Sequence, residues 1–249
     1  GGLGITREHD DAADPGQAIG CTPKSLPERL QVKAAEIAYL INPVNAPSLA
    51  AFGPQADGIA VMEPLRIAAL TSKYWGAKSR VLTVSFMETT PADLRRRIVS
   101  HLNAWNRMGG ISFAETSGVG VVRISRGSGG YYSYLGTDVL LIPRNRQTMN
   151  LQGFTMNTSE AEFRRVVRHE AGHTLAFPHE HMRRALVDRI DRKKAYAYFL
   201  RTQGWDKATV DAQVLTALDE RSLMSTPADQ NSIMCYQLPA SITKDGRPI

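Results

Sequence analysis

The chain has little of what marks several large classes of protein. Its 249 residues include only two cysteines, Cys21 and Cys235, too few for a dense disulfide framework. No apolar run approaches the roughly 20 residues that a membrane-spanning helix needs. Aromatic residues make up 7% of the chain, and no basic stripe with interleaved aromatic residues occurs, which argues against nucleic-acid binding. We therefore expect neither a membrane span nor a nucleic-acid partner.

The composition is that of a folded protein. Hydrophobic residues make up 43% and charged residues 22%, enough to bury a core and too few charges for bulk disorder. The net charge is +6, but the basic residues occur in short runs among apolar residues at helical spacing. Such runs are typical of solvated helix faces.

Hydrophobic periodicity predicts alternating helices and strands. Residues 25–41 carry a helical stripe that ends before Pro43, and residues 80–87 alternate like a strand. A helix is predicted next, with Thr90 as its cap and Pro91 at its first position. Further strands are expected at 111–115 and 121–126, and another after the glycine-rich turn that begins at 127. This order predicts an α+β or mixed α/β sheet domain.

Four of the six histidines lie in one short stretch, "RHEAGHTLAFPHEH", residues 168–181. The residues before it predict a helix, with a capping box formed by Ser159 and Glu162. His169 and His173 are four residues apart, so they share one face of that helix and their imidazoles can converge on one metal ion. This spacing suits two nitrogen ligands of zinc.

The rest of the stretch predicts a catalytic zinc site. Pro178 ends the helix, so the chain can turn and bring His179 back as a third ligand. Three nitrogen ligands and a water make an open site, whereas structural sites are closed by four protein ligands. Glu170, between the first two histidines, is placed to act as the general base on that water.

The motif "HEAGHTLAFPHEH" resembles the extended zinc motif of the metzincins, H-E-x-x-H-x-x-G-x-x-H. Glu180 after the third histidine resembles the astacin family, and "SIMCYQ" resembles the astacin Met-turn. "MRRALVDRID" and "GSGGYYSYLG" are weaker matches, and the resemblance covers about 80–237.

The resemblance implies an α+β fold: a metzincin-type zincin domain with a twisted mixed sheet, a long zinc-binding helix and a helical C-terminal subdomain ending in a Met-turn. It implies a zinc-dependent endopeptidase with Met234 beneath the metal and Tyr236 as a second catalytic residue that stabilises the oxyanion or gates the metal. In astacins a strand near the glycine-rich stretch binds extended substrate by main-chain pairing. We expect a secreted, monomeric protease of proteins or peptides, although no segment has the pattern of a signal peptide.

Two departures from the family are present. Ala176 stands where metzincins usually carry glycine, and we expect it to adopt a left-handed conformation at a cost on the order of 1 kcal/mol. Cys235 stands where many astacins have histidine, and the disulfides usual inside the astacin catalytic domain have no counterpart here.

The first 70 residues precede the metzincin-like part, residues 71–249, and could be a prosegment or an accessory extension. Cys21 raises three possibilities. Its thiolate could occupy the fourth zinc position and keep the enzyme latent, as in metzincins with a cysteine switch. It could form a disulfide with Cys235, which we favour from the sequence, or remain a free thiol. A zinc-binding protein without catalysis is the remaining alternative, and Glu170 argues against it.

Overall fold

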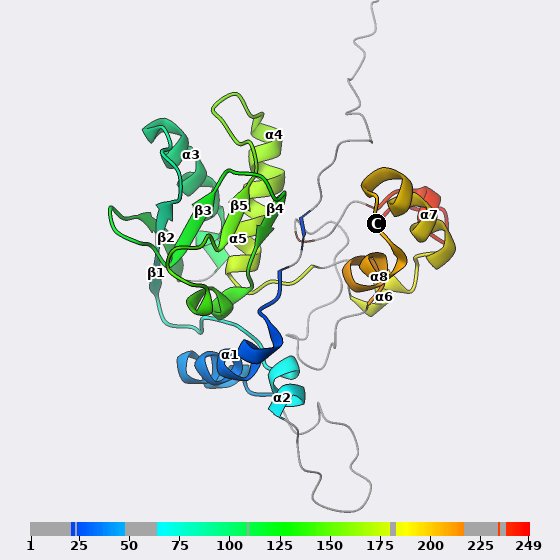
Figure 1. Ribbon diagram of the computed structural model, residues 1–249, viewed down its shortest axis with the longest axis horizontal. Coiled ribbons are helices and arrows are strands. Elements are labelled where there is room, and N and C mark those ends of the chain that lie inside the picture. Colours follow the sequence, from blue (N-terminus) through cyan, green and yellow to red (C-terminus); the bar gives the residue numbers. More distant parts are fainter. Residues whose placement is uncertain are drawn as a thin grey trace, which may run out of the picture.

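The computed structural model describes residues 21–22, 24–47, 64–108, 110–179, 183–216, 234 and 238–249 (Figure 1). The helices and strands of the first part of the chain are α1 Glu28–Ile41, η1 Pro43–Asn45, α2 Pro64–Leu70, β1 Arg80–Phe86, α3 Ala92–Leu102, η3 Asn103–Met108, β2 Ile111–Glu115, β3 Val122–Ser125, β4 Tyr131–Ser133, η4 Gly136–Leu141 and β5 Met149–Leu151. Those of the second part are α4 Glu160–Glu162, η5 Phe163–Val167, α5 Arg168–Thr174, α6 Arg184–Val187, α7 Arg192–Gln203, α8 Lys207–Val210, η7 Asp211–Leu215 and η9 Ala240–Ile242.

Five strands form one mixed sheet in the order β2-β1-β3-β5-β4. The pairs β1–β2, β1–β3 and β3–β5 are parallel, and only β4 runs antiparallel to its neighbour β5. Strand β4 therefore forms one edge of the sheet, and its outer side pairs with no further strand among the described residues.

The main core lies between the sheet and two helices, α3 and the helix over residues 160–174. All four residues of β3 are buried, as expected for a central parallel strand. Helix α3 and the helix 160–174 pack against the sheet (Figure 1). The buried residues of this core include Trp75, Leu82, Val84, Leu94, Ile98, Leu102, Phe113, Ile124, Met149, Phe154, Phe163 and Val167.

The N-terminal helices α1 and α2 pack against each other below the sheet (Figure 1). Asn45, which is 1% exposed, ties them to the segment that leads into β1. Its side-chain amide donates to Tyr74 O at 2.9 Å and its Oδ1 accepts from Tyr74 N at 2.9 Å. Two reciprocal hydrogen bonds from one buried side chain fix the N-terminal helices on this segment.

The C-terminal helices α6, α7 and α8 have a core of their own, separate from the sheet (Figure 1). Its buried residues include Leu186, Ile190, Phe199, Val210, Val214, Leu238 and Ile242. Residues 238–249 return to these helices, since Ile190 bridges Thr243 and Lys244 N donates to Arg189 O. Among the described residues no helix is long and apolar enough to span a membrane.

The predicted α+β class and mixed sheet are confirmed, and some local predictions are wrong. Pro91 is the residue before the first helical residue of α3, and Thr90 provides no side-chain cap, because its hydroxyl donates to Glu88 O instead. The strand after the glycine-rich turn is only three residues long, and the residues that follow form the 3₁₀ helix η4. The short strand β5 is not predicted by the sequence.

Candidate metal centre

A continuous helix over residues 160–174 positions the first two histidines. Ser159 caps it as predicted, its Oγ accepting from Glu162 N at 3.2 Å. The reciprocal arm of the capping box is replaced, because the Glu162 carboxylate accepts two hydrogen bonds from Arg165. Residues 163–167 are π-helical, a rare geometry that is frequent at functional sites.

The helix ends at Thr174, the residue after His173, and the chain reverses to bring in His179. Ala176 has φ +79° and is the single non-glycine residue with positive φ among the described residues. Its N–H donates to His173 O and that of Phe177 to Gly172 O, so the last helical carbonyls remain bonded through the turn. The left-handed alanine expected from the sequence is therefore present, and the turn it makes delivers His179.

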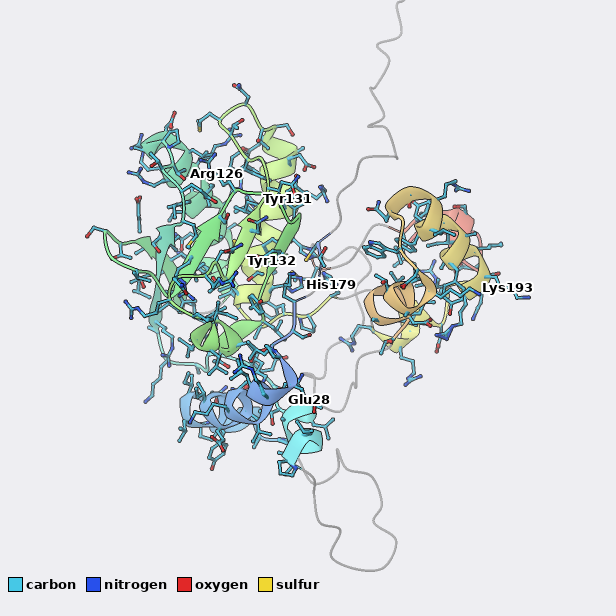
Figure 2. All side chains as sticks on the ribbon, viewed as in Figure 1. Glu28, Arg126, Tyr131, Tyr132, His179 and Lys193 are labelled. Atoms are coloured by element: carbon cyan, nitrogen blue, oxygen red, sulfur yellow. The ribbon has the colours of Figure 1, made fainter. Side chains whose placement is uncertain are left out.

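The three predicted ligand histidines converge on one point. His169, His173 and His179 are 6%, 5% and 2% exposed. His179 Nε2 lies 3.0 Å from the Nε2 atoms of both His169 and His173. Figure 2 shows His179 on the side of the sheet that faces the C-terminal helices.

The protonation of His173 indicates that this cluster fits a metal ion. His173 Nδ1 lies 2.8 Å from Phe177 O, and because a carbonyl only accepts, Nδ1 carries the proton and Nε2 of the neutral ring bears a lone pair. One proton on His179 Nε2 can serve only one of its two neighbours. A cation accepts a lone pair from all three, so the donor set fits zinc.

Cys21 is the fourth member of the cluster. Its Sγ and the ligand atoms of the three histidines all lie within 4.8 Å of one another, and all four residues are buried. Cys21 is a free thiol, so the disulfide with Cys235 favoured from the sequence is wrong; Cys235 itself lies outside the described residues. The favoured interpretation failed because the fold brings Cys21 to the histidines.

A backbone contact holds Cys21 in place. Cys21 forms a parallel bridge with Tyr131, and Thr22 N donates to Tyr131 O at 2.8 Å. Residues 21–22 therefore lie along the open edge of β4, the strand that carries Tyr131 and Tyr132 in Figure 2. The blue segment in Figure 1 passes between the sheet and the C-terminal helices.

The Glu170 carboxylate lies beside the cluster, and its two oxygens differ in their hydrogen bonding. Glu170 is 1% exposed, and its Oε2 accepts from Cys21 Sγ at 3.4 Å. Its Oε1 has no hydrogen-bond partner within the described part of the chain. Burial raises the pKa of Glu170 to about 8, while the Cys21 thiol and the charge of Arg165 oppose the shift. Burial and the Glu170 carboxylate raise the pKa of the Cys21 thiol well above its ordinary value. A buried carboxylate oxygen without a partner is costly, and a positive charge or a water at the centre compensates it.

Comparison with known proteins identifies the family. Searches of protein-family models and of curated proteins find no match. A solved structure of myroilysin, an astacin-family zinc metalloprotease, is 31% identical over 71% of this chain and 86% of its own, with a TM-score of 0.66. The chain belongs to the astacin-like metzincin family.

Two further structures are similar to this astacin-like chain. A crystal structure of myroilysin is 28% identical over 92% of this chain and 91% of its own, with a TM-score of 0.52. High choriolytic enzyme 1, a hatching-enzyme zinc-protease of the medaka fish Oryzias latipes, is 23% identical over 68% of this chain and 76% of its own, with a TM-score of 0.44. Membership of the astacin-like family, shown by the 31% identical structure, makes the chain a zinc metalloprotease, as its motif predicts.

Met234 lies against the helix over residues 160–174, called the metal-binding helix below, in line with the Met-turn resemblance. It is 3% exposed, and a Cβ at Gly172 would collide with its Sδ. Gly172 is thus required for the close approach of Met234 to the helix. Tyr236, Glu180 and His181 lie outside the described residues, so the role predicted for Tyr236 stays a prediction.

Two tryptophans, which the sequence does not mark as partners of this helix, hold the part of it that carries His169 and His173. Trp105 Nε1 donates to Arg168 O at 2.8 Å, and Trp75 Nε1 donates to Thr174 O at 2.8 Å. The Arg168 carbonyl directly precedes His169, and the Thr174 carbonyl directly follows His173. No local pattern marks either tryptophan as a partner of the helix, because both contacts join residues distant in sequence.

Proposed function

We propose that the chain is a zinc-dependent endopeptidase held in a latent state. His169, His173 and His179 bind the zinc ion, Glu170 is the general base, and Cys21 occupies the fourth metal position. The observation that carries this proposal is the convergence of four buried ligand atoms, three nitrogens and one sulfur, within 4.8 Å of one another. Such a set matches tetrahedral zinc.

The distances support this ligand set. Zinc–nitrogen bonds of about 2.0–2.1 Å at tetrahedral angles put ligand nitrogens about 3.3 Å apart. The two measured separations between histidine Nε2 atoms are 3.0 Å, so small adjustments bring the rings to ligand distance. The hydrogen bond from His173 Nδ1 to Phe177 O orients that ring, as second-sphere partners commonly do for metal-binding histidines.

The chemistry follows from the position of Glu170. His169, His173 and His179 would hold the zinc ion, which would polarise the scissile carbonyl and lower the pKa of a bound water to about 7. The Glu170 carboxylate takes a proton from the attacking water and delivers it to the leaving amine. For both steps its oxygens must face the reacting atoms, and Oε1 has no hydrogen-bond partner among the residues that the structure describes. Tyr236 is proposed to stabilise the oxyanion of the intermediate.

The proposed latency rests on the positions of Cys21 and Thr22, which lie against Glu170, the histidines and the edge of β4. The Cys21 thiol contacts Glu170, and its sulfur is within metal-ligand reach of the histidines. A cation at this centre favours the thiolate, which then closes the coordination sphere. Thr22 pairs with Tyr131 at the edge of β4, where a peptide substrate would bind in extended form.

We accordingly propose that residues 1–70 are an inhibitory N-terminal segment and residues 71–249 the catalytic domain. The similarity to one myroilysin structure over 92% of this chain supports an N-terminal segment shared by the two proteins. A secreted, monomeric enzyme acting on proteins or peptides completes the proposal, in line with the astacin-like family.

The test compares zinc content and hydrolysis of casein and a fluorogenic peptide in four full-length proteins. Wild type is expected to hold one zinc with little hydrolysis, and Cys21→Ala one zinc with hydrolysis at least about tenfold higher. Cys21→Ala with Glu170→Gln is expected to keep zinc and lose hydrolysis, and Cys21→Ala with His179→Ala to lose zinc.

The outcomes separate the alternatives. Equal hydrolysis by wild type and Cys21→Ala would remove the latency proposal and leave the peptidase. Zinc in every variant except the histidine variant, with no hydrolysis in any, would favour a zinc-binding protein without catalysis. Absence of zinc from wild type would contradict the site itself.

A further inference from the structure

The hydroxyl of Thr174 lies where the metal-binding helix meets the open edge strand. Thr174 follows the metal ligand His173 directly, ends α5 and is 0% exposed. Its Oγ1 lies 2.9 Å from Ser133 Oγ on β4 and 3.4 Å from Glu170 O one turn back. One side chain therefore joins the helix that carries the histidines to the strand that can bind an extended chain.

The distances give this hydrogen-bond chain a direction. Ser133 Oγ donates to Tyr134 O at 2.9 Å, so its lone pairs face Thr174. Each hydroxyl has one proton, and the two short contacts are both satisfied when Thr174 donates to Ser133 and Ser133 donates to Tyr134 O. These hydrogen bonds thereby connect the C-terminal end of the helix to the backbone at the end of β4.

The main chain of Thr174 is fixed as firmly as its side chain. Its carbonyl accepts from Trp75 Nε1 at 2.8 Å, and Trp75 is 3% exposed in the main core. Threonine is a poorer helix former than alanine, and a buried hydroxyl costs free energy unless it is bonded. Helix formation and burial would both favour alanine at this position, so the hydroxyl indicates a positional role.

Strand β4, which Thr174 contacts through Ser133, is the strand that pairs with the extended residues 21–22. Thr22 N donates to Tyr131 O, two residues before Ser133, on the open side of β4. On the other side β4 pairs with β5, Ser133 opposite Met149. A shift of β4 relative to the helix displaces any peptide bound on its edge relative to the three histidines and Glu170.

We propose that Thr174 is a positioning residue for peptide hydrolysis. Through Ser133 it holds β4 at a fixed height above the metal-binding helix, so that one peptide can pair with the strand and reach the metal at the same time. Loss of this alignment weakens binding of the peptide. This inference rests on the proposed peptidase function and on binding of substrate along β4.

The experiment uses full-length, zinc-loaded protein with Cys21→Ala as background. Thr174→Val keeps the shape of the side chain and removes the hydroxyl, Ser133→Ala removes its acceptor, and the double variant removes both. The matched control is Thr148→Val. Thr148 is also 0% exposed in the sheet region, and its Oγ1 accepts from Arg123 N at 3.0 Å, away from the metal-binding helix.

The readouts are KM and kcat for a fluorogenic peptide, zinc content, and amide hydrogen exchange of residues 131–134 and 122–125. Thr174→Val and Ser133→Ala are each expected to raise KM about tenfold with zinc retained and kcat within about twofold. The double variant is expected to have the same KM as either single variant, since each substitution breaks the same hydrogen bond between Thr174 and Ser133. Thr148→Val should leave KM unchanged.

An unchanged KM in Thr174→Val and Ser133→Ala, or an equal change in Thr148→Val, would overturn the inference. Absence of hydrolysis in the background protein would instead contradict the proposed function. If the background protein is inactive, amide hydrogen exchange tests the positioning role of Thr174 independently of hydrolysis. Faster exchange in residues 131–134 but not in 122–125 of Thr174→Val supports the positioning role, and equal behaviour of the two segments refutes it.

Discussion

Gly172→Ala tests how closely Met234 approaches the metal-binding helix. The new Cβ would collide with Met234 Sδ and lie 3.1 Å from Trp105 Cζ2. Alanine gains about 1 kcal/mol over glycine in a helix, whereas overpacking a buried contact costs about 1–3 kcal/mol. We therefore expect a net loss of about 1 kcal/mol. Met234 must also retreat from the helix, which we expect to weaken zinc binding about tenfold.

Gly118→Ala is the matched control. The nearest atom to a Cβ at Gly118 is Thr116 Oγ1 at 3.8 Å, so this substitution meets no obstacle and should stabilise the protein by about 0.4–1 kcal/mol. The two variants then differ by about 2 kcal/mol. With an unfolding entropy near 0.5 kcal/mol/K for a chain of this length, that is a difference in Tm of about 4 °C. Thermal unfolding and competition with a fluorescent zinc chelator measure the two effects. If Gly172→Ala matches the control in Tm and the wild type in zinc affinity, the packing of Met234 under the helix is refuted.

Two further predictions concern ion pairs outside the centre. Lys73 Nζ lies 3.4 Å from Asp138 Oδ1, with both side chains nearly buried, so Lys73→Met leaves a buried carboxyl without its partner. We expect a loss of about 3–5 kcal/mol in urea unfolding, and a loss below 1 kcal/mol would contradict it. Arg189 lowers the pKa of Asp245 to about 2 from its ordinary value of 3.8, so this pair stabilises the fold above pH 3.8 and the effect is lost as the pH falls through 2. Asp245→Asn should therefore lower Tm at pH 6 and have no effect near pH 2; a pH-independent difference in Tm would show that the pair does not act through this titration.

The three histidines could be predicted because their arrangement is local. The spacing of His169 and His173 fixes their common face on one helix, and Pro178 forces the reversal that returns His179. The left-handed backbone of Ala176 is expected from the resemblance, because metzincins usually carry glycine at this position, and the structure has it. Each of these inferences involves residues fewer than a dozen positions apart.

The place of Cys21 beside the three histidines is one of the possibilities that the sequence raises, but the sequence could not decide for it, because the contacts of Cys21 are distant in sequence. Cys21 and Glu170 are 149 positions apart, and only the fold brings the thiol to the carboxylate. From the sequence alone, two cysteines in a protein expected to be secreted favour a disulfide. The same limit applies to Trp75, which reaches Thr174 across 99 positions.

The missed elements are short or irregular. Strand β5 spans three residues, fewer than a periodic pattern needs to be recognised. The π-helical turn at residues 163–167 keeps Phe163 and Val167 in the core, so its apolar pattern does not distinguish it from an α-helix.

X-ray absorption at the zinc edge of the full-length, zinc-loaded protein tests the proposed centre most directly. The account predicts three nitrogen ligands at about 2.0–2.1 Å and one sulfur at about 2.3 Å, with the sulfur lost in Cys21→Ala. A wild-type spectrum with nitrogen and oxygen ligands only would contradict the placement of Cys21 on the metal.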